Sequence, residues 1–421
     1  MVAVAVAVVG LQFALGRELL FDVWQPSALV LPFFAFLVVA AVLAMGDVVM
    51  APWVVGLGSL LVQTHMSHTA AVSVVTAVGM GLCVVAGRRG GRPERLRGPL
   101  VWTGVVAVVA WVQPVVEQFT GRGEGNLSRI VGAATAGDAA AIGWSRASRL
   151  TAEIMVMGPW FTRSSYASAV PPTAPDAPIF GIVGVGPAVV LLAVIGVALV
   201  GAVVWAVRAG RGRVATMVAM AGVALVTGFV ALAISPVNQV ALAMHQMRWL
   251  WPIAAFLTAA GLTWVLSVAQ SRPPAHRGLL IGAAAAAVLV AAANLPTHDS
   301  RASGPTDTAD HLASGQELMS QLGTLEGRGP VLYTWKWSRF AEPYSGMLFA
   351  ELQDRGIPFV FDDEGMIRQF GEGRRHDGTA TLRLWLVEGP ATLEVPEGAE
   401  RVALADGPSG LVAVFVEPIR G

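Results

Sequence analysis

The sequence has few of the residues on which disulfide frameworks and soluble surfaces depend. Cysteine occurs once in 421 residues, at Cys83, which excludes a disulfide framework and a cysteine-based metal site. Lysine also occurs once, at Lys336. Charged residues make up only 13% of the chain, against roughly 25% in a soluble domain, and 55% of the residues are hydrophobic. Most of the chain is therefore predicted to lie in a membrane.

The charges divide the chain into two parts. Net charge is zero and no basic tract is present, so nucleic-acid binding is not expected. Residues 1–293 hold 17 arginines and 9 acidic residues, whereas residues 294–421 hold 11 basic and 19 acidic residues. This predicts a polytopic membrane domain over 1–293 and a soluble domain over 294–421.

Nine segments before residue 294 approach the pattern of a membrane-spanning helix, which needs about 20 mainly apolar residues. The first starts at Met1 without the positive leader of a signal peptide and is too short to span comfortably. We expect it to be the end of a helix that begins before Met1. The nine segments are 1–15, 27–45, 48–63, 69–86, 100–116, 179–207, 214–234, 250–269 and 279–293.

Three short arginine-rich connectors predict the orientation of the spans. They are 87–98, 208–213 and 270–277, and the positive-inside rule places all three in the cytoplasm. The other connectors and the tail from Asn294 then fall on the outer side of the plasma membrane. The outer connectors are 16–26, 64–68, 117–178 and 235–249.

The outer segment 117–178 is too long for a simple connector and is expected to be functional. It contains apolar residues at helical spacing, such as Leu150 and Ile154, interleaved with Arg146 and Arg149. This pattern predicts helices that lie on the outer membrane surface with their arginines toward the headgroups.

The tail has the alternating pattern of a small α/β domain. The predicted elements are helices near 308–325 and 340–355, and strands at 330–335, 357–361, 381–387, 400–405 and 411–416. The sequence therefore predicts an α-helical multi-pass membrane bundle of about eight or nine spans with a C-terminal extracytoplasmic α/β domain.

Polar residues at the outer mouths of the spans are the candidate site residues, because polar groups at membrane depth are costly and mark function. In chain order they are Asp22, Trp24, Gln63, His65, Glu117, Gln118, Asn126, His245 and Arg248. If the outer ends of these spans lie side by side, the candidate residues would form one outward-facing pocket. Arginine pairs with phosphate in a bidentate fork, and carboxylates bind divalent cations, so such a pocket suits a phosphorylated sugar donor.

Each candidate also has a structural interpretation. Asp22 and Trp24 suit a helix cap and an interfacial aromatic belt. His65 and His68 are three residues apart and either share a metal ion or form a polar turn. Arg248 either faces a ligand or extends its guanidinium to the outer headgroups.

Four segments resemble those of actinobacterial multi-pass proteins, and through them the GT-C superfamily of polyprenyl-phosphate-sugar glycosyltransferases. They are DVWQP at 22–26, LVQTH at 61–65, QPVVEQ at 113–118 and MRWLWP at 247–252. The resemblance covers most of 10–260. It implies transfer of a sugar from a polyprenyl-phosphate donor in the bilayer to an extracytoplasmic acceptor.

The resemblance also implies roles for individual residues. Members of the family carry their principal catalytic acid in the first extracytoplasmic loop, and this sequence resembles them only from the third helix onward. The principal base is therefore expected before Met1, and a chain without it would be inactive. Asp22 would take the place of the second acidic motif and bind a divalent cation, Mg²⁺ or Mn²⁺, the one cofactor expected. Segment 117–178 would close over donor and acceptor, and Arg248 would face the lipid phosphate.

Two other functions remain open from the sequence. The main alternative is a non-catalytic membrane scaffold of cell-envelope assembly that acts through its outer α/β domain. A transporter is less favoured, because no mid-span charge or inverted repeat is visible.

Overall fold

The computed structural model describes residues 1–15, 25–90, 97–120, 125–128, 132, 141–156, 184–235, 247–295, 308–334, 344–389, 398–408 and 410–419. The chain divides into two compact units, Met1–Ser300 and Arg301–Gly421. The division falls a few residues after the change in composition at 294.

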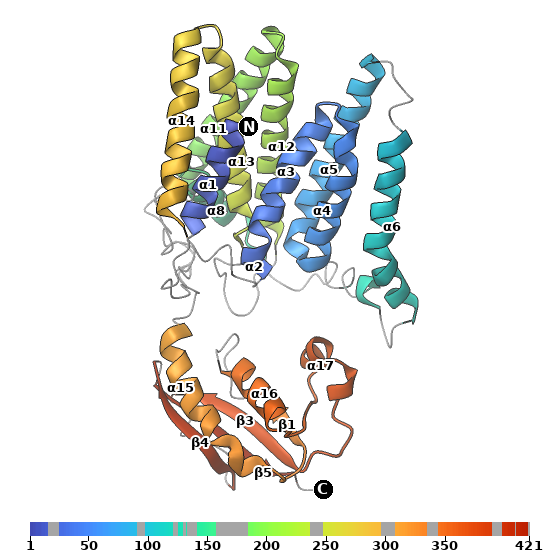
Figure 1. Ribbon diagram of the computed structural model, residues 1–421, viewed down its shortest axis with the longest axis vertical. Helices are drawn as coiled ribbons and strands as arrows, with labels where there is room; N and C mark the ends of the chain where they lie inside the picture. The colour runs from blue at the N-terminus through green and yellow to red at the C-terminus, as the bar shows by residue number, and fades with distance from the viewer. Residues whose placement is uncertain are drawn as a thin grey trace. The chain divides into compact units, whose positions relative to one another are not determined.

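The first unit is a bundle of helices (Figure 1). Among the described residues, seven helices are long and apolar enough to cross a membrane, and two shorter apolar helices accompany them. The helices are α1 (Val2–Leu15), α2 (Gln25–Ala28), α3 (Val30–Ala44), α4 (Ala51–Thr64), α5 (Thr69–Gly90), α6 (Arg97–Thr120), α8 (Trp144–Val156), α11 (Val185–Arg208), α12 (Gly212–Ile234), α13 (Leu250–Ala269) and α14 (Pro273–Ala293), with 3-10 turns η2 (Val48–Met50) and η3 (Met66–His68).

The prediction of eight or nine spans counted two segments that form only short helices. Helix α1 has 14 residues, which at about 1.5 Å per residue rise about 21 Å and fall short of a hydrocarbon core of about 30 Å. The predicted span 48–63 is likewise a shorter apolar helix, Val48–Thr64. The shortness of the first segment was expected from the sequence, whereas that of 48–63 was not.

Three other helices differ in their ends from the predicted spans. Helix α6 covers Arg97–Thr120 rather than 100–116, so Glu117 and Gln118 belong to a helix and not to a loop. Helix α14 begins at Pro273 rather than at 279, and α11 begins at Val185 rather than at 179. Helices α6 and α14 extend beyond the predicted spans because hydropathy falls at the first polar residues, whereas a helix continues as long as its backbone hydrogen bonds are made.

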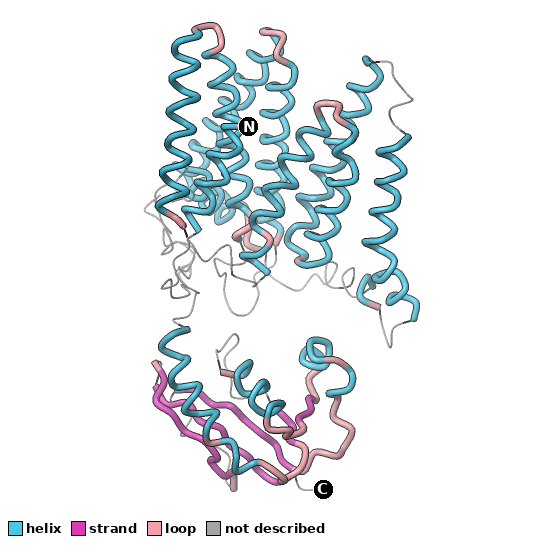
Figure 2. Tube along the Cα trace, in the orientation of Figure 1, coloured by secondary structure: helices cyan, strands magenta, loops and turns pink. Residues whose placement is uncertain are grey.

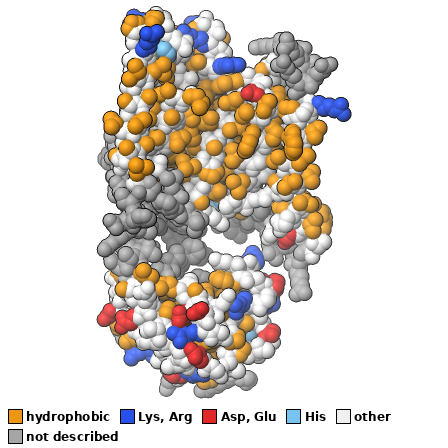
Figure 3. Space-filling view, viewed as in Figure 1, with side chains coloured by type: hydrophobic (Ala, Val, Ile, Leu, Met, Phe, Trp, Pro, Cys, Tyr) orange, Lys and Arg blue, Asp and Glu red, His pale blue; other side chains and the backbone are white. Residues whose placement is uncertain are grey.

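The bundle is held together by close packing of small and apolar residues. Helix α3 packs against α4, α5 and α13, and α12 packs against α5, α11 and α13. At Gly79 of α5, an added Cβ would lie 3.3 Å from the carbonyl oxygen of Ala40 on α3, so glycine permits this close approach. Helices α6 and α14 have no buried residues. Hydrophobic side chains cover the visible exterior of the bundle (Figure 3), as expected of a surface solvated by lipid.

The connectors gather at two opposite ends of the bundle (Figure 2). At one end lie the turn after α11, with Arg208 and Arg211, and the turn after α13, with Arg272. We call this end the basic end. At the other end lie the turn at 64–68 and the start of α13 at 247–249. We call this the polar end, and it is the end that the positive-inside rule predicts to face outward.

The second unit is an α/β domain with one five-stranded sheet (Figure 1). Its strands are β1 (Val331–Thr334), β2 (Phe359–Phe361), β3 (Leu382–Glu388), β4 (Glu400–Gly407) and β5 (Gly410–Pro418), in the order β2-β1-β3-β5-β4. Strand β1 runs parallel to β2 and β3, whereas β5 runs antiparallel to β3 and β4. All five predicted strands are confirmed.

Helices α15 (Thr308–Ser320) and α16 (Ser345–Asp354) contribute to the main core of this sheet. Alternate residues of the strands, such as Leu384 and Val414, pack with Leu348 of α16, whereas Trp385 and Phe415 form a separate cluster. The period of two that predicted the strands therefore also sorts their side chains into two sets. A further helix, α17 (Glu364–Phe370), was not predicted.

Candidate functional site

Arg248 lies at the polar end, just before α13, and it is buried. Its side chain is 6% exposed, and Nη1 donates a hydrogen bond to Oγ of Ser27 on α2, which is 2% exposed. The flanking Met247, Trp249 and Trp251 are buried as well. Arg248 therefore does not extend to the headgroups, because its guanidinium is enclosed by protein.

Helix α8 carries a second group of buried polar side chains. Arg149 is 6% exposed and Glu153 is 0% exposed, and Thr151 between them is fully buried. The prediction that Arg149 faces the headgroups from a surface helix is therefore wrong. Helix α8 packs against α11, α12 and α13, so its polar face is enclosed as well as its apolar face.

Backbone hydrogen bonds fix the start of α8 to the end of α12. The amide of Ile142 donates to the carbonyl of Ser235 over 2.9 Å, and the amide of Gly143 donates to Ala233 over 3.0 Å. Gly143 has a φ of +82°, a conformation that glycine adopts at low cost. Because α12 ends at the polar end, α8 begins there too.

We refer to Ser27, Arg149, Glu153 and Arg248 together as the polar centre. Ser27 of α2 and Arg248 before α13 are hydrogen-bonded to each other, Arg149 and Glu153 lie on α8, which packs against α13, and all four are buried. Sequence reasoning found Arg248 but missed Glu153. The sequence signal that could have identified Glu153 is its spacing from Arg149, because residues four apart lie on the same face of a helix.

The imidazoles of His65 and His68 form a polar turn between α4 and α5. His65 Nδ1 lies 2.8 Å from Ser67 Oγ, and the two imidazole centroids lie 6.0 Å apart. His68 packs edge-on against Phe33, with centroids 5.0 Å apart. Burial lowers the pKa of His65 from its ordinary value. These contacts fit the alternative of a polar turn.

The candidates on α6 form local contacts of their own. Glu117 Oε2 accepts a hydrogen bond from the amide of Asn126 over 3.0 Å, and Gln118 Nε2 donates to Ser128 Oγ over 2.6 Å. These bonds connect the helical residues 126–128 to the end of α6. Gln63 of α4 donates to the Ala110 carbonyl of α6 over 2.9 Å, and so joins two helices.

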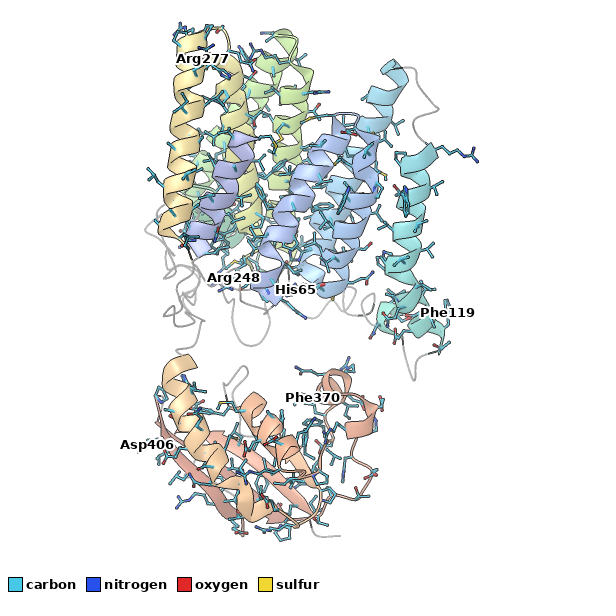
Figure 4. All side chains as sticks on the ribbon, in the orientation of Figure 1. His65, Phe119, Arg248, Arg277, Phe370 and Asp406 are labelled. Atoms are coloured by element: carbon cyan, nitrogen blue, oxygen red, sulfur yellow. The ribbon has the colours of Figure 1, made fainter. Side chains whose placement is uncertain are left out.

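The described candidates fall into three groups. Arg248 belongs to the polar centre, His65 to the turn at 64–68, and Glu117 with Gln118 and Asn126 to the end of α6, while Gln63 joins α4 to α6. Figure 4 shows Arg248 and His65 at the same end of the bundle, with Phe119 of α6 set apart from both. Helix α6 packs against α4 and η2.

Three candidates, Asp22, Trp24 and His245, lie outside the described residues, as does much of 117–178. The predicted cation at Asp22 therefore has no described ligand set. In the ranges that the structure describes, no three His, Cys, Asp or Glu side chains form a group able to hold a metal ion.

Comparison with protein-family models, with curated proteins and with solved structures gave no match for this chain. Its class therefore rests on its own features. They define a helical protein with seven candidate membrane spans in its described residues, a small α/β domain and a buried, charged polar centre.

Proposed function

We propose that the chain is a GT-C-like membrane glycosyltransferase that transfers a sugar from a polyprenyl-phosphate donor to an extracytoplasmic acceptor. The observation that carries the proposal is the burial of Arg248 at the polar end of the bundle, together with the burial of Arg149 on α8. Burial of a guanidinium is costly, and charged groups at membrane depth usually serve a ligand or an ion.

The proposed chemistry assigns the arginines to the leaving group. In an inverting transfer, the acceptor hydroxyl attacks the anomeric carbon and the bond from that carbon to the phosphate oxygen breaks. The leaving phosphate gains negative charge, which a preorganised guanidinium stabilises without reorganisation of solvent. Arg248 is held by Ser27, so its orientation is fixed before the donor binds. Glu153 adds a buried acidic side chain on α8.

The remaining parts of the reaction rest on the sequence resemblance. The acceptor proton would pass to a base in the acidic loop that the family carries before its third helix. A divalent cation, Mg²⁺ or Mn²⁺, at Asp22 would support the leaving phosphate. The α/β domain would lie on the same side of the plasma membrane as the acceptor.

The substitution Arg248→Lys tests the proposal. Lysine keeps the charge but cannot reproduce the planar fork, so binding of a polyprenyl phosphate should weaken by about tenfold to a hundredfold, as expected when about 1.5–3 kcal/mol of charge-assisted hydrogen bonding is lost. The measurement is a titration of the purified full chain with a fluorescent polyprenyl phosphate.

Arg146→Lys is the matched control, because Arg146 lies on α8 but is less buried than Arg149. It should bind the probe as the wild type does. Equal binding by wild type and Arg248→Lys would refute the role of Arg248. Absence of binding by the wild type would favour the envelope scaffold.

A further inference from the structure

A cleft of about 690 Å³ opens on the α/β domain, where α16, α17 and the start of β2 meet. The exposed face of α16 forms one wall, and Phe370 at the end of α17 forms the other (Figure 4). The described lining belongs entirely to the α/β domain, and none of the residues proposed for glycosyl transfer lies in it. The cleft is therefore a second candidate site.

Helix α16 lines the cleft with short and polar side chains. Gly346, Ala350, Gln353 and Asp354 are exposed and line the cleft. Their spacing of three or four positions places them on one face of the helix. At Gly346 an added Cβ would meet no atom within 4 Å outside its own stretch of helix, so a ligand can approach the backbone there.

The floor of the cleft is aromatic. Phe349 and Phe359 stack with ring centroids 5.4 Å apart, and Phe370 packs edge-on against Phe349 with centroids 5.2 Å apart. Phe349 and Phe359 are buried, whereas Phe370 is 40% exposed. The cleft therefore offers a ligand a flat apolar surface that its neighbours hold in place.

Arg374 orients the polar end of the cleft. Its Nη1 donates to the carbonyl of Phe359 over 3.2 Å, and its Nη2 donates to Oε1 of Gln353 over 3.1 Å. The guanidinium carbon also lies 3.8 Å from the ring centroid of Phe359. Among the described residues, no hydrogen bond engages the side-chain nitrogen of Gln353 or the carboxylate of Asp354. One donor group and one acceptor group therefore stand beside the aromatic floor.

We propose that this cleft binds a neutral carbohydrate chain. A sugar ring has an apolar face of C–H groups and a rim of hydroxyls that donate and accept hydrogen bonds. The aromatic floor matches the apolar face, and Gln353 and Asp354 match the hydroxyls. Small-molecule sites commonly combine an apolar lining with a few polar groups that fix orientation.

Other ligand classes fit this lining less well. An apolar peptide would leave Gln353 and Asp354 desolvated without partners, which is costly. An anion would meet the carboxylate of Asp354, and a cation would meet the guanidinium of Arg374. The positive-inside rule predicts that the domain faces outward, where it can meet carbohydrate chains of the cell envelope. Binding there does not require transfer chemistry, so the inference goes beyond the proposed function.

The test compares two alanine-to-methionine variants of the full chain in phosphatidylcholine nanodiscs. Ala350→Met places a longer side chain in the cleft, and Ala313→Met places the same side chain on the exposed face of α15, outside the described lining. Both positions are exposed and helical, and methionine is a good helix former, so neither variant should lose stability. Each protein is titrated by calorimetry with linear hexasaccharides of glucose, of mannose and of N-acetylglucosamine, and with an acetylated pentapeptide of alanine and leucine.

We expect the wild type and Ala313→Met to bind at least one hexasaccharide equally well. Ala350→Met should bind it at least about tenfold more weakly, because methionine takes the place of several ligand atoms. Asp354→Ala should weaken the same binding by about tenfold through the loss of a hydrogen bond to a charged group, and it replaces Ala350→Met if that variant fails to fold.

Equal binding by the wild type and the cleft variants would overturn the proposal, as would a wild type that binds none of the hexasaccharides. Binding of the pentapeptide alone would overturn it in favour of an apolar peptide. None of these probes contains phosphate, so a failure here is distinguishable from a failure in the polyprenyl-phosphate titration that tests the proposed function.

Discussion

The contribution of the hydrogen bond from Arg248 to Ser27 to the free energy of unfolding can be measured directly. Both side chains are buried, and the bond joins residues 221 positions apart. A hydrogen bond with one charged partner contributes about 1.5–3 kcal/mol. Because Ser27→Ala removes the acceptor and leaves the guanidinium buried, we expect the free energy of unfolding to fall by about 1–3 kcal/mol, which is about fivefold to a hundredfold in the equilibrium constant.

The single cysteine provides the assay. Cys83 lies on α5, is 9% exposed and is the only thiol in the chain, so a fluorogenic thiol reagent reports unfolding at one known position. Unfolding in mixtures of mild detergent and sodium dodecyl sulfate is measured for wild type, Ser27→Ala, Arg248→Gln and the double variant. The four free energies form a double-mutant cycle that isolates the pairwise term.

The cycle should give a coupling energy between Ser27 and Arg248 of about 1.5–3 kcal/mol. Ser59 supplies the matched control, because it is 7% exposed and accepts a hydrogen bond from Trp111 rather than from an arginine. Ser59→Ala and Arg248→Gln should be additive within about 0.5 kcal/mol. A coupling energy between Ser27 and Arg248 below about 0.5 kcal/mol would refute the buried hydrogen bond. It would also refute the proposal that Ser27 preorganises Arg248.

Two further predictions concern the sidedness of the chain and the acid stability of its α/β domain. In a Cys83→Ser background, a cysteine at Gly371 should react with an impermeant thiol reagent in intact cells, and one at Gly90 should not; the reverse pattern would invert the predicted topology. Hydrogen bonds from Arg375 hold the pKa of Glu364 below its usual 4.5, so their stabilisation is present above that value and is lost as pH falls through the lowered pKa. Glu364→Gln should therefore flatten the decline in thermal stability below about pH 4.5, and an unchanged acid profile would exclude this ion pair as its cause.

The polar centre shows where sequence reasoning reached its limit. Arg248 was identified because it precedes an apolar run, but its burial depends on α2, which lies more than two hundred residues away in the chain. Arg149 and Glu153 fit an amphipathic helix equally well on a membrane surface or inside a bundle. Only the packing of α8 against α11, α12 and α13 distinguishes these two environments.

The sequence by itself determined the elements whose signals are local. Runs of apolar residues located the long helices of the bundle, and alternation located all five strands of the α/β domain, because both patterns follow from the geometry of neighbouring residues. The tertiary structure alone decided the strand order β2-β1-β3-β5-β4 and the separation of α6 from the polar centre. These features arise where segments distant in the chain meet, and the cost of burying a charge there depends on partners that no local pattern records.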